Sequence, residues 1–77
     1  MKVLLVDDDE DFLSGLSIFL YKHDIESVLT NRTAEAEQLL KKTDFDAILL
    51  DVMLPGCNGF EFLPTIRKTS DVPVIML

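Results

Sequence analysis

The chain has 77 residues, 48% of them hydrophobic and 27% charged, and this length allows one domain at most. The hydrophobic share excludes a disordered tail, and a single cysteine excludes an internal disulfide framework. Fourteen acidic against seven basic residues give a net charge of −7, which disfavours direct contact with nucleic acid. No run approaches the roughly 20 apolar residues of a membrane span. We therefore expect a cytoplasmic protein without membrane contact.

Short apolar runs without alternation predict buried parallel strands at residues 3–6, 47–50 and 74–77, and a weaker strand is predicted at 27–30. Between these strands, apolar residues recur at helical spacing in segments 9–22, 33–42 and 59–68. Regular alternation of strands and helices predicts an α/β fold, with a doubly wound parallel sheet and helices on both of its faces.

Each predicted helix has further sequence features. The expected buried face of the first helix comprises Phe12, Leu16, Phe19 and Leu20. Thr33 is expected to cap the second helix and Asn58 the third. Pro64 falls inside the third helix, which we expect to be kinked or shortened there because proline lacks a backbone N–H.

Acidic residues follow two of the predicted strands. Asp7 and Asp8 follow residues 3–6, and Asp51 follows residues 47–50. If these strands are neighbours, three carboxylates converge at the carboxyl edge of the sheet, where such folds place their ligands. Like charges about 4 Å apart repel by about 4 kcal/mol at an effective dielectric near 20. The cluster therefore needs a proton or a cation, and carboxylate oxygens suit Mg²⁺.

Simpler interpretations of these acids remain open when each is taken alone. Residues 7–11 also fit an acid-rich helix start, which remains the best explanation for Asp9 and its two successors. Asp51 also fits a turn residue. After it, Pro55 fixes φ and Gly56 and Gly59 permit positive φ. We therefore expect a shaped loop, longer than an ordinary turn between strand and helix.

Together these residues resemble the receiver domains of two-component response regulators. The resemblance rests on Asp7-Asp8, on Asp51 with the pairs Leu54-Pro55 and Asn58-Gly59, and on the apolar segment 72–77, which is similar to the family's fourth strand. It covers the whole chain. It implies a flavodoxin-like receiver fold with strand order 2-1-3-4. Residues 1–77 are expected to be a partial receiver that stops after the fourth strand, without the fourth helix, fifth strand and fifth helix.

The resemblance also implies roles for individual residues. Asp51 would be the phosphoacceptor, taking a phosphoryl group from a sensor histidine kinase. Mg²⁺ would be held by Asp7, Asp8, Asp51 and the main-chain carbonyl of Met53, while Pro55 and Gly59 shape the loop. The domain would be a signalling phosphoacceptor rather than an enzyme. It would control transcription as part of a longer regulator.

The chain departs from the family pattern in several places. Asn58 stands where the family usually has Asp, and the switch Ser/Thr and the phosphate-binding Lys are absent from this chain. Phosphorylation and switching are therefore expected to be impaired. Because the fourth strand would present an open edge, we also expect a dimer or oligomer formed through that edge.

An alternative from an enzyme class is a fragment of a haloacid-dehalogenase-type phosphatase with Asp7 as its nucleophile. Asp7 and Asp9 follow a buried strand, as the nucleophile and acid of that class do. However, Asp11 stands where a Thr is expected, and Asp51 with its loop is left unexplained. The receiver interpretation accounts for more of the sequence.

Overall fold

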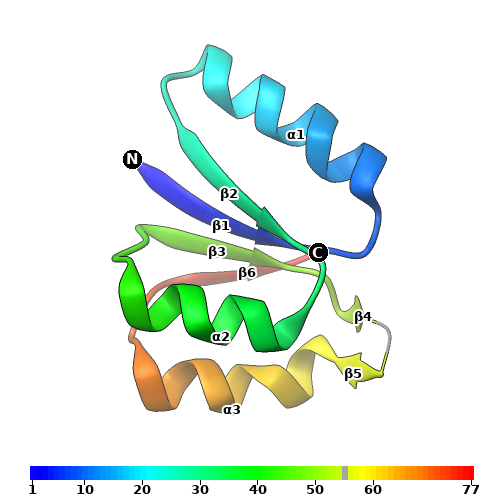
Figure 1. Cartoon of the computed structure of the whole chain (residues 1–77), viewed down its shortest axis with the longest axis vertical. Coiled ribbons are helices and arrows are strands. Elements are labelled where there is room, and N and C mark those ends of the chain that lie inside the picture. Colours follow the sequence, from blue (N-terminus) through cyan, green and yellow to red (C-terminus); the bar gives the residue numbers. More distant parts are fainter. Residues whose placement is uncertain (55) are drawn as a thin grey trace.

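Four parallel strands form one sheet between two layers of helices. The computed structural model describes residues 1–54 and 56–77, and of Cys57 the backbone alone. The strands are β1 (Lys2–Val6), β2 (Glu26–Thr30), β3 (Ala47–Leu50) and β6 (Val74–Met76), in the order β2-β1-β3-β6. Figure 1 shows α1 (Glu10–Lys22) on one side of the sheet, with α2 (Thr33–Lys42) and α3 (Gly59–Thr69) on the other. The predicted α/β fold and strand order are confirmed, β6 being the fourth strand of the sheet.

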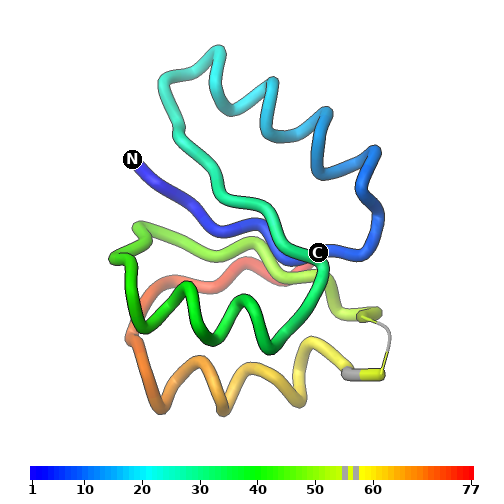
Figure 2. The backbone as a smooth tube through the Cα atoms, in the orientation of Figure 1, coloured from blue at the N-terminus to red at the C-terminus, as the bar shows by residue number. Residues whose placement is uncertain are grey.

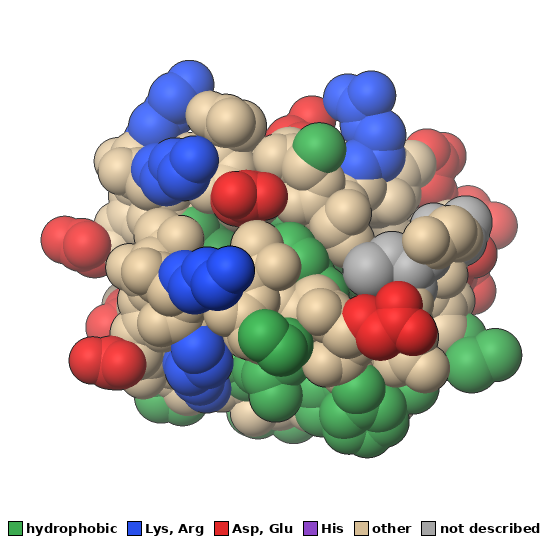
Figure 3. Space-filling view, turned by 90° about the horizontal axis from the view of Figure 1, so that it is seen from below, with side chains coloured by type: hydrophobic (Ala, Val, Ile, Leu, Met, Phe, Trp, Pro, Cys, Tyr) green, Lys and Arg blue, Asp and Glu red, His purple; other side chains and the backbone are tan. Residues whose placement is uncertain are grey.

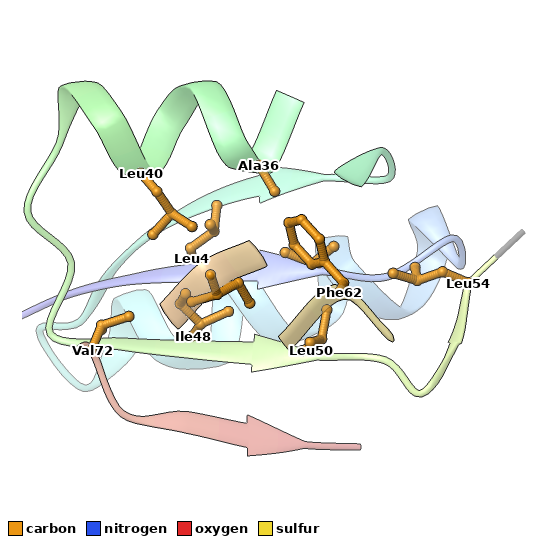
Figure 4. Packing of buried hydrophobic residues seen from close by; sticks show 10 residues of the cluster. Leu4, Ala36, Leu40, Ile48, Leu50, Leu54, Phe62 and Val72 are labelled. Carbon is orange, nitrogen blue, oxygen red and sulfur yellow. The ribbon is translucent and has the colours of Figure 1, made fainter. Parts of the chain in front are cut away.

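The two faces of the sheet bury different side chains. The larger cluster, shown in Figure 4, comprises Leu4, Val6, Ala36, Leu40, Ile48, Leu50, Leu54, Phe62, Ile66 and Val72. On the side of α1, the buried cluster comprises Val3, Leu5 and Leu13. Successive side chains of a strand point to opposite faces, so β1 supplies both clusters. Burial on both faces explains why its sequence is apolar without alternation.

The buried face of α1 differs from the prediction. Leu13 is only 4% exposed, whereas Phe12 and Phe19 are 45% and 58% exposed. Leu16 and Leu20 pack against the buried cluster, as predicted. The helix carries two adjoining apolar stripes, and the one that faces the sheet contains Leu13. Periodicity identifies a stripe but does not choose between neighbours that differ by one position.

The helix ends follow the predictions in part. Asn58 caps α3, its Oδ1 accepting from the Phe60 N–H at 2.8 Å. At α2 the N-cap is Arg32, not Thr33, and its side chain makes no capping hydrogen bond. Pro64 does not shorten α3, which continues to Thr69. Because Pro64 is exposed, water can bond the carbonyl that loses its helical donor there.

Basic side chains gather at the carboxyl ends of two helices, and a run of acidic residues lies after β1. The last turns of α2 and α3 hold Lys41, Lys42, Arg67 and Lys68, and Figure 3 shows Lys and Arg side chains over the face that these helices form. Acidic residues 7–11 lie at the opposite end, after β1 and at the start of α1. No helix in the described part of the chain is long and apolar enough to span a membrane.

The turn from α3 into β6 is held by Arg67. Its Nη1 donates to the carbonyl oxygens of Ser70 at 3.3 Å and Val72 at 2.6 Å. We expect Arg67→Ala to lower the free energy of unfolding by about 1–2 kcal/mol, measured by urea denaturation. Lys68→Ala, at an exposed neighbour, is the control and should change it by less than about 0.5 kcal/mol. Equal stability of the two variants would contradict this role.

Candidate functional site

The carboxyl ends of β1 and β3 lie side by side. The register pairs Val6 with Leu50, and the Asp51 N–H donates to the Val6 carbonyl oxygen at 2.9 Å. On the other side of β1, the Asp7 N–H donates to the Thr30 carbonyl oxygen at 3.2 Å. In Figure 2 these strand ends lie on the side of the molecule where the chain's C-terminus is found. Strand order reverses between β1 and β3, which is where doubly wound folds place their ligands.

Three carboxylates meet at this edge. Oxygens of Asp7, Asp8 and Asp51 all lie within 4.8 Å of one another. Asp7 is buried, Asp51 half-buried and Asp8 exposed, so the cluster opens to solvent on one side. The structure thus brings together the three acids that the sequence placed at the strand ends. An open set of carboxylate oxygens fits a small divalent cation that keeps several water ligands, as Mg²⁺ does.

Two of these carboxylates are oriented by backbone amides two residues further along the chain. Asp7 Oδ1 accepts from the Asp9 N–H at 2.9 Å, and Asp51 Oδ1 accepts from the Met53 N–H at 3.0 Å. Asp9 also caps α1 by accepting from the Phe12 N–H, in line with its predicted place at the helix start. Sequence reasoning missed the contact between Asp9 and Asp7. The known tendency of Asp to bond the amide two residues on could have indicated it.

The electrostatics of the cluster centre on Asp7. Burial raises the pKa of the Asp7 carboxyl above its ordinary value of 3.8, and the neighbouring carboxylates of Asp51 and Asp8 raise it further. The hydrogen bond from the Asp9 N–H acts in the opposite direction. The site is therefore short of positive charge, and a cation or a proton would relieve the repulsion.

The raised pKa of Asp7 predicts a pH dependence of stability in the absence of divalent metal. The folded state holds the Asp7 proton more tightly than the unfolded state. The contribution of this proton to the free energy of unfolding is therefore fully present below pH 3.8 and is lost as pH rises through the raised pKa. Asp7→Asn should remove this loss. The variant should therefore be more stable than the parent at neutral pH, and this difference in stability should shrink as pH falls. Urea denaturation with a chelator, from neutral pH downward, measures the difference. An advantage independent of pH would contradict the assignment.

The segment after Asp51 folds back on itself. Strands β4 (Met53–Leu54) and β5 (Cys57–Asn58) form an antiparallel pair, which was not predicted because strands of two residues give no periodic signal. Gly56 has the predicted positive φ, at 71°. Pro55 lies outside the described residues. Met53 exposes 77% of its surface, and the contact that the structure gives it toward Asp51 comes from its main chain.

Gly59 is needed for a different reason from the one predicted. It begins α3 and does not have a positive φ. Its N–H donates to the Val52 carbonyl oxygen at 2.8 Å. A Cβ at this position would lie 2.5 Å from the carbonyl oxygen of Asp51 and 3.0 Å from Cα of Val52. The absence of a side chain lets the first turn of α3 rest directly on the backbone of the Asp51 loop.

Sequence comparisons agree with this geometry. Residues 3–77 match the family described as the response regulator receiver domain. The chain is 45% identical over 76 residues to the transcriptional regulatory protein CpxR homolog of Haemophilus influenzae, covering 99% of this chain and 33% of that protein. It is 40% identical to the transcriptional regulatory protein CpxR of Escherichia coli K12, covering 99% and 32%. The chain thus spans about a third of the length of these curated relatives.

Solved structures lead to the same family. The non-phosphorylated HemR receiver domain from Leptospira biflexa superposes with a TM-score of 0.88 at 33% identity, covering 97% of this chain and 61% of that one. The BeF3-activated N-terminal receiver domain of Klebsiella pneumoniae RstA gives 0.90 at 30% identity, covering 99% and 65%. These likenesses do not support the phosphatase alternative. The chain belongs to the family of response regulator receiver domains.

Proposed function

We propose that Asp51 accepts a phosphoryl group from the phosphohistidine of a sensor histidine kinase. One Asp51 carboxylate oxygen forms a bond to phosphorus as the nitrogen–phosphorus bond of the donor breaks, and the released imidazole takes up a proton. The convergence of three carboxylates within 4.8 Å at the end of β3 carries this proposal. The Met53 amide holds the Asp51 carboxylate in a fixed orientation, and phosphoryl transfer depends mainly on such alignment and on charge neutralisation.

We also propose that this cluster of carboxylates holds a Mg²⁺ ion as cofactor. Mg²⁺ would be bound by Asp7, Asp8, Asp51 and the Met53 main-chain carbonyl, and when bound it neutralises charge on the transferring phosphoryl oxygens. Asp7 is the buried ligand, and the Asp9 amide fixes its orientation. Asp8, at the exposed side of the cluster, leaves room for solvent and for the incoming phosphoryl group.

A direct test is phosphoryl incorporation from a small phosphoramidate donor in the presence of Mg²⁺. We expect an acyl phosphate on Asp51, mapped by mass spectrometry of peptides. Incorporation should be slow, because the family's phosphate-binding Lys and switch Ser/Thr are absent from residues 1–77. A phosphoryl group on Asp7 would instead favour phosphatase-type chemistry. Incorporation at the rate of a complete receiver domain would contradict the expected impairment while leaving the assignment of Asp51 intact.

Binding of Mg²⁺ predicts a gain in stability, because the site exists only in the folded chain. At a free Mg²⁺ concentration tenfold above its dissociation constant, the free energy of unfolding should rise by about 1.4 kcal/mol. Thermal denaturation with Mg²⁺ or with a chelator, at matched ionic strength, measures this change. Equal melting temperatures would show that the carboxylates do not form a metal site.

The wider setting is also part of the proposal. The chain covers 61% and 65% of the two receiver structures, which supports the view that it corresponds to the first part of such a domain. In a longer, cytoplasmic regulator it would control transcription, without itself contacting nucleic acid or membrane. Among the described residues, β6 pairs only with β3. We therefore propose a dimer or oligomer formed through the open edge of β6.

A further inference from the structure

The edge of the sheet opposite β6 is formed by β2, which pairs with no strand but β1 in the part of the chain that the structure describes. The Glu26 N–H donates to the Met1 carbonyl oxygen at 2.9 Å, and the Thr30 carbonyl oxygen accepts from Asp7. In a strand, the backbone groups of successive residues point to alternate sides. Residues 26, 28 and 30 therefore bond to β1, and the N–H and C=O groups of Ser27 and Leu29 point outward. In Figure 1, β6, which forms the other edge of the sheet, is drawn fainter because it is more distant.

A groove runs along this edge, between β2 and α1. It has a volume of about 600 Å³, and its lining includes Ile18, Tyr21, Ile25, Ser27 and Leu29. Ile18 and Tyr21 are 58% and 79% exposed. β2 itself contains no Lys or Pro, the residues that commonly protect an edge strand from pairing. An open backbone edge therefore lies beside exposed apolar side chains.

We propose that this edge binds a second copy of the chain, with the two β2 strands antiparallel about a twofold axis at Val28. The numbers of any two residues that face each other across the axis then sum to 56. Ser27 of each copy lies opposite Leu29 of the other, and all four of these residues have outward-pointing backbone groups. The pair can form four interchain hydrogen bonds without breaking any within the sheet. The exposed groove residues of both copies lie beside the paired strands.

Charge complementarity favours this occupant and this orientation. At one end of β2, Lys22 lines the groove. At the other end, Glu10 and Glu35 line a hollow of about 300 Å³ that shares Leu29 with the groove. Glu35 is paired with Arg32 at 3.4 Å, and Asp24 lies near the Lys22 end, so the attraction that remains is between Lys22 of one copy and Glu10 of the other. An antiparallel pair brings these two ends together, whereas a parallel pair would place the Glu10 side chains of both copies at the same end. Glu26 lies opposite the uncharged Thr30 and already has Lys2 at 3.9 Å, so no like charges face each other within the paired strands.

The test must separate this contact from the proposed contact at β6. The Pro73 carbonyl oxygen and the Leu77 N–H bond to β3, so the Val74 N–H points to the open side of β6. Val74→Pro removes that outward donor and leaves the sheet bonds intact. Ser27→Pro does the same on β2. In the Val74→Pro chain, sedimentation analysis should still detect a dimer, and adding Ser27→Pro should raise its dissociation constant at least about tenfold.

Two further measurements distinguish weakened pairing from misfolding and locate the twofold axis. Leu29→Lys, which changes a side chain that is 38% exposed, should also weaken the Val74→Pro dimer. With Cys57 replaced by Ser, Val28→Cys should form an interchain disulfide on mild oxidation, because residues facing each other on the axis have Cα atoms about 4.5–5.5 Å apart. Ser27→Cys is the matched control and should not cross-link, because each residue 27 faces residue 29. A monomeric Val74→Pro chain, or equal cross-linking of the two variants, would overturn the proposal and leave the assignment of Asp51 unaffected.

Discussion

Replacing Asp51 with asparagine should stabilise the metal-free protein and remove its response to Mg²⁺. In the parent chain, the Asp51 carboxylate lies within 4.8 Å of those of Asp7 and Asp8 and raises the pKa of Asp7. Asparagine removes this repulsion, while its side-chain oxygen can still accept from the Met53 N–H. Since Asp51 is partly exposed and solvent screens its charge, we expect a gain of about 1 kcal/mol.

The same substitution removes one of the three side-chain ligands proposed for the cation. Urea denaturation should therefore show that Asp51→Asn is more stable than the parent with a chelator and less stable than the parent at saturating Mg²⁺. Asp44→Asn, at an exposed acid outside the cluster, is the control and should keep the parent's response to Mg²⁺. Acyl phosphate should also be absent from Asp51→Asn. An unchanged Mg²⁺ response in this variant would remove Asp51 from the metal site.

Much of the fold could be predicted because burial leaves a strong pattern in the sequence. β3 is buried between two helical layers, and its apolar run gave boundaries identical to those observed, at residues 47–50. α2 likewise begins and ends where its spacing and terminal charges predicted, at 33 and 42. Once the order of strands and helices was known, the meeting of acids at the carboxyl edge followed from the topology of doubly wound sheets.

Other features depend on contacts that one sequence does not encode locally. The choice of Leu13 over Phe12 as a buried residue depends on the rotation of α1 on the sheet, and both choices satisfy helical periodicity. The β4–β5 pair is too short to produce a pattern. The contribution of Asp9 to the site is a backbone donor to Asp7, which residue identity alone does not reveal. Gly59 was correctly predicted to begin the third helix, but its close approach to Asp51 appears only when α3 is docked.

That approach predicts a large effect for Gly59→Ala. The new Cβ would lie 2.5 Å from the carbonyl oxygen of Asp51 and 3.0 Å from Cα of Val52, and both of these are backbone atoms that cannot rotate away. The loop or the first turn of α3 must shift. We expect the free energy of unfolding to fall by about 2–3 kcal/mol. Because the shift moves Asp51, Mg²⁺ should also stabilise this variant less than the parent.

The same substitution at Gly15 is a matched control, because a Cβ there meets no atom within 4 Å. Gly15→Ala, inside α1, should stabilise the protein by up to about 1 kcal/mol through helix propensity. Met76 Cε lies 3.1 Å from the same Cβ position at Gly59, but a methionine side chain can move aside. Adding Met76→Ala to Gly59→Ala should therefore fail to restore Mg²⁺ binding. Restoration would show that the side chain of Met76, rather than the backbone of Asp51, excludes a side chain at residue 59.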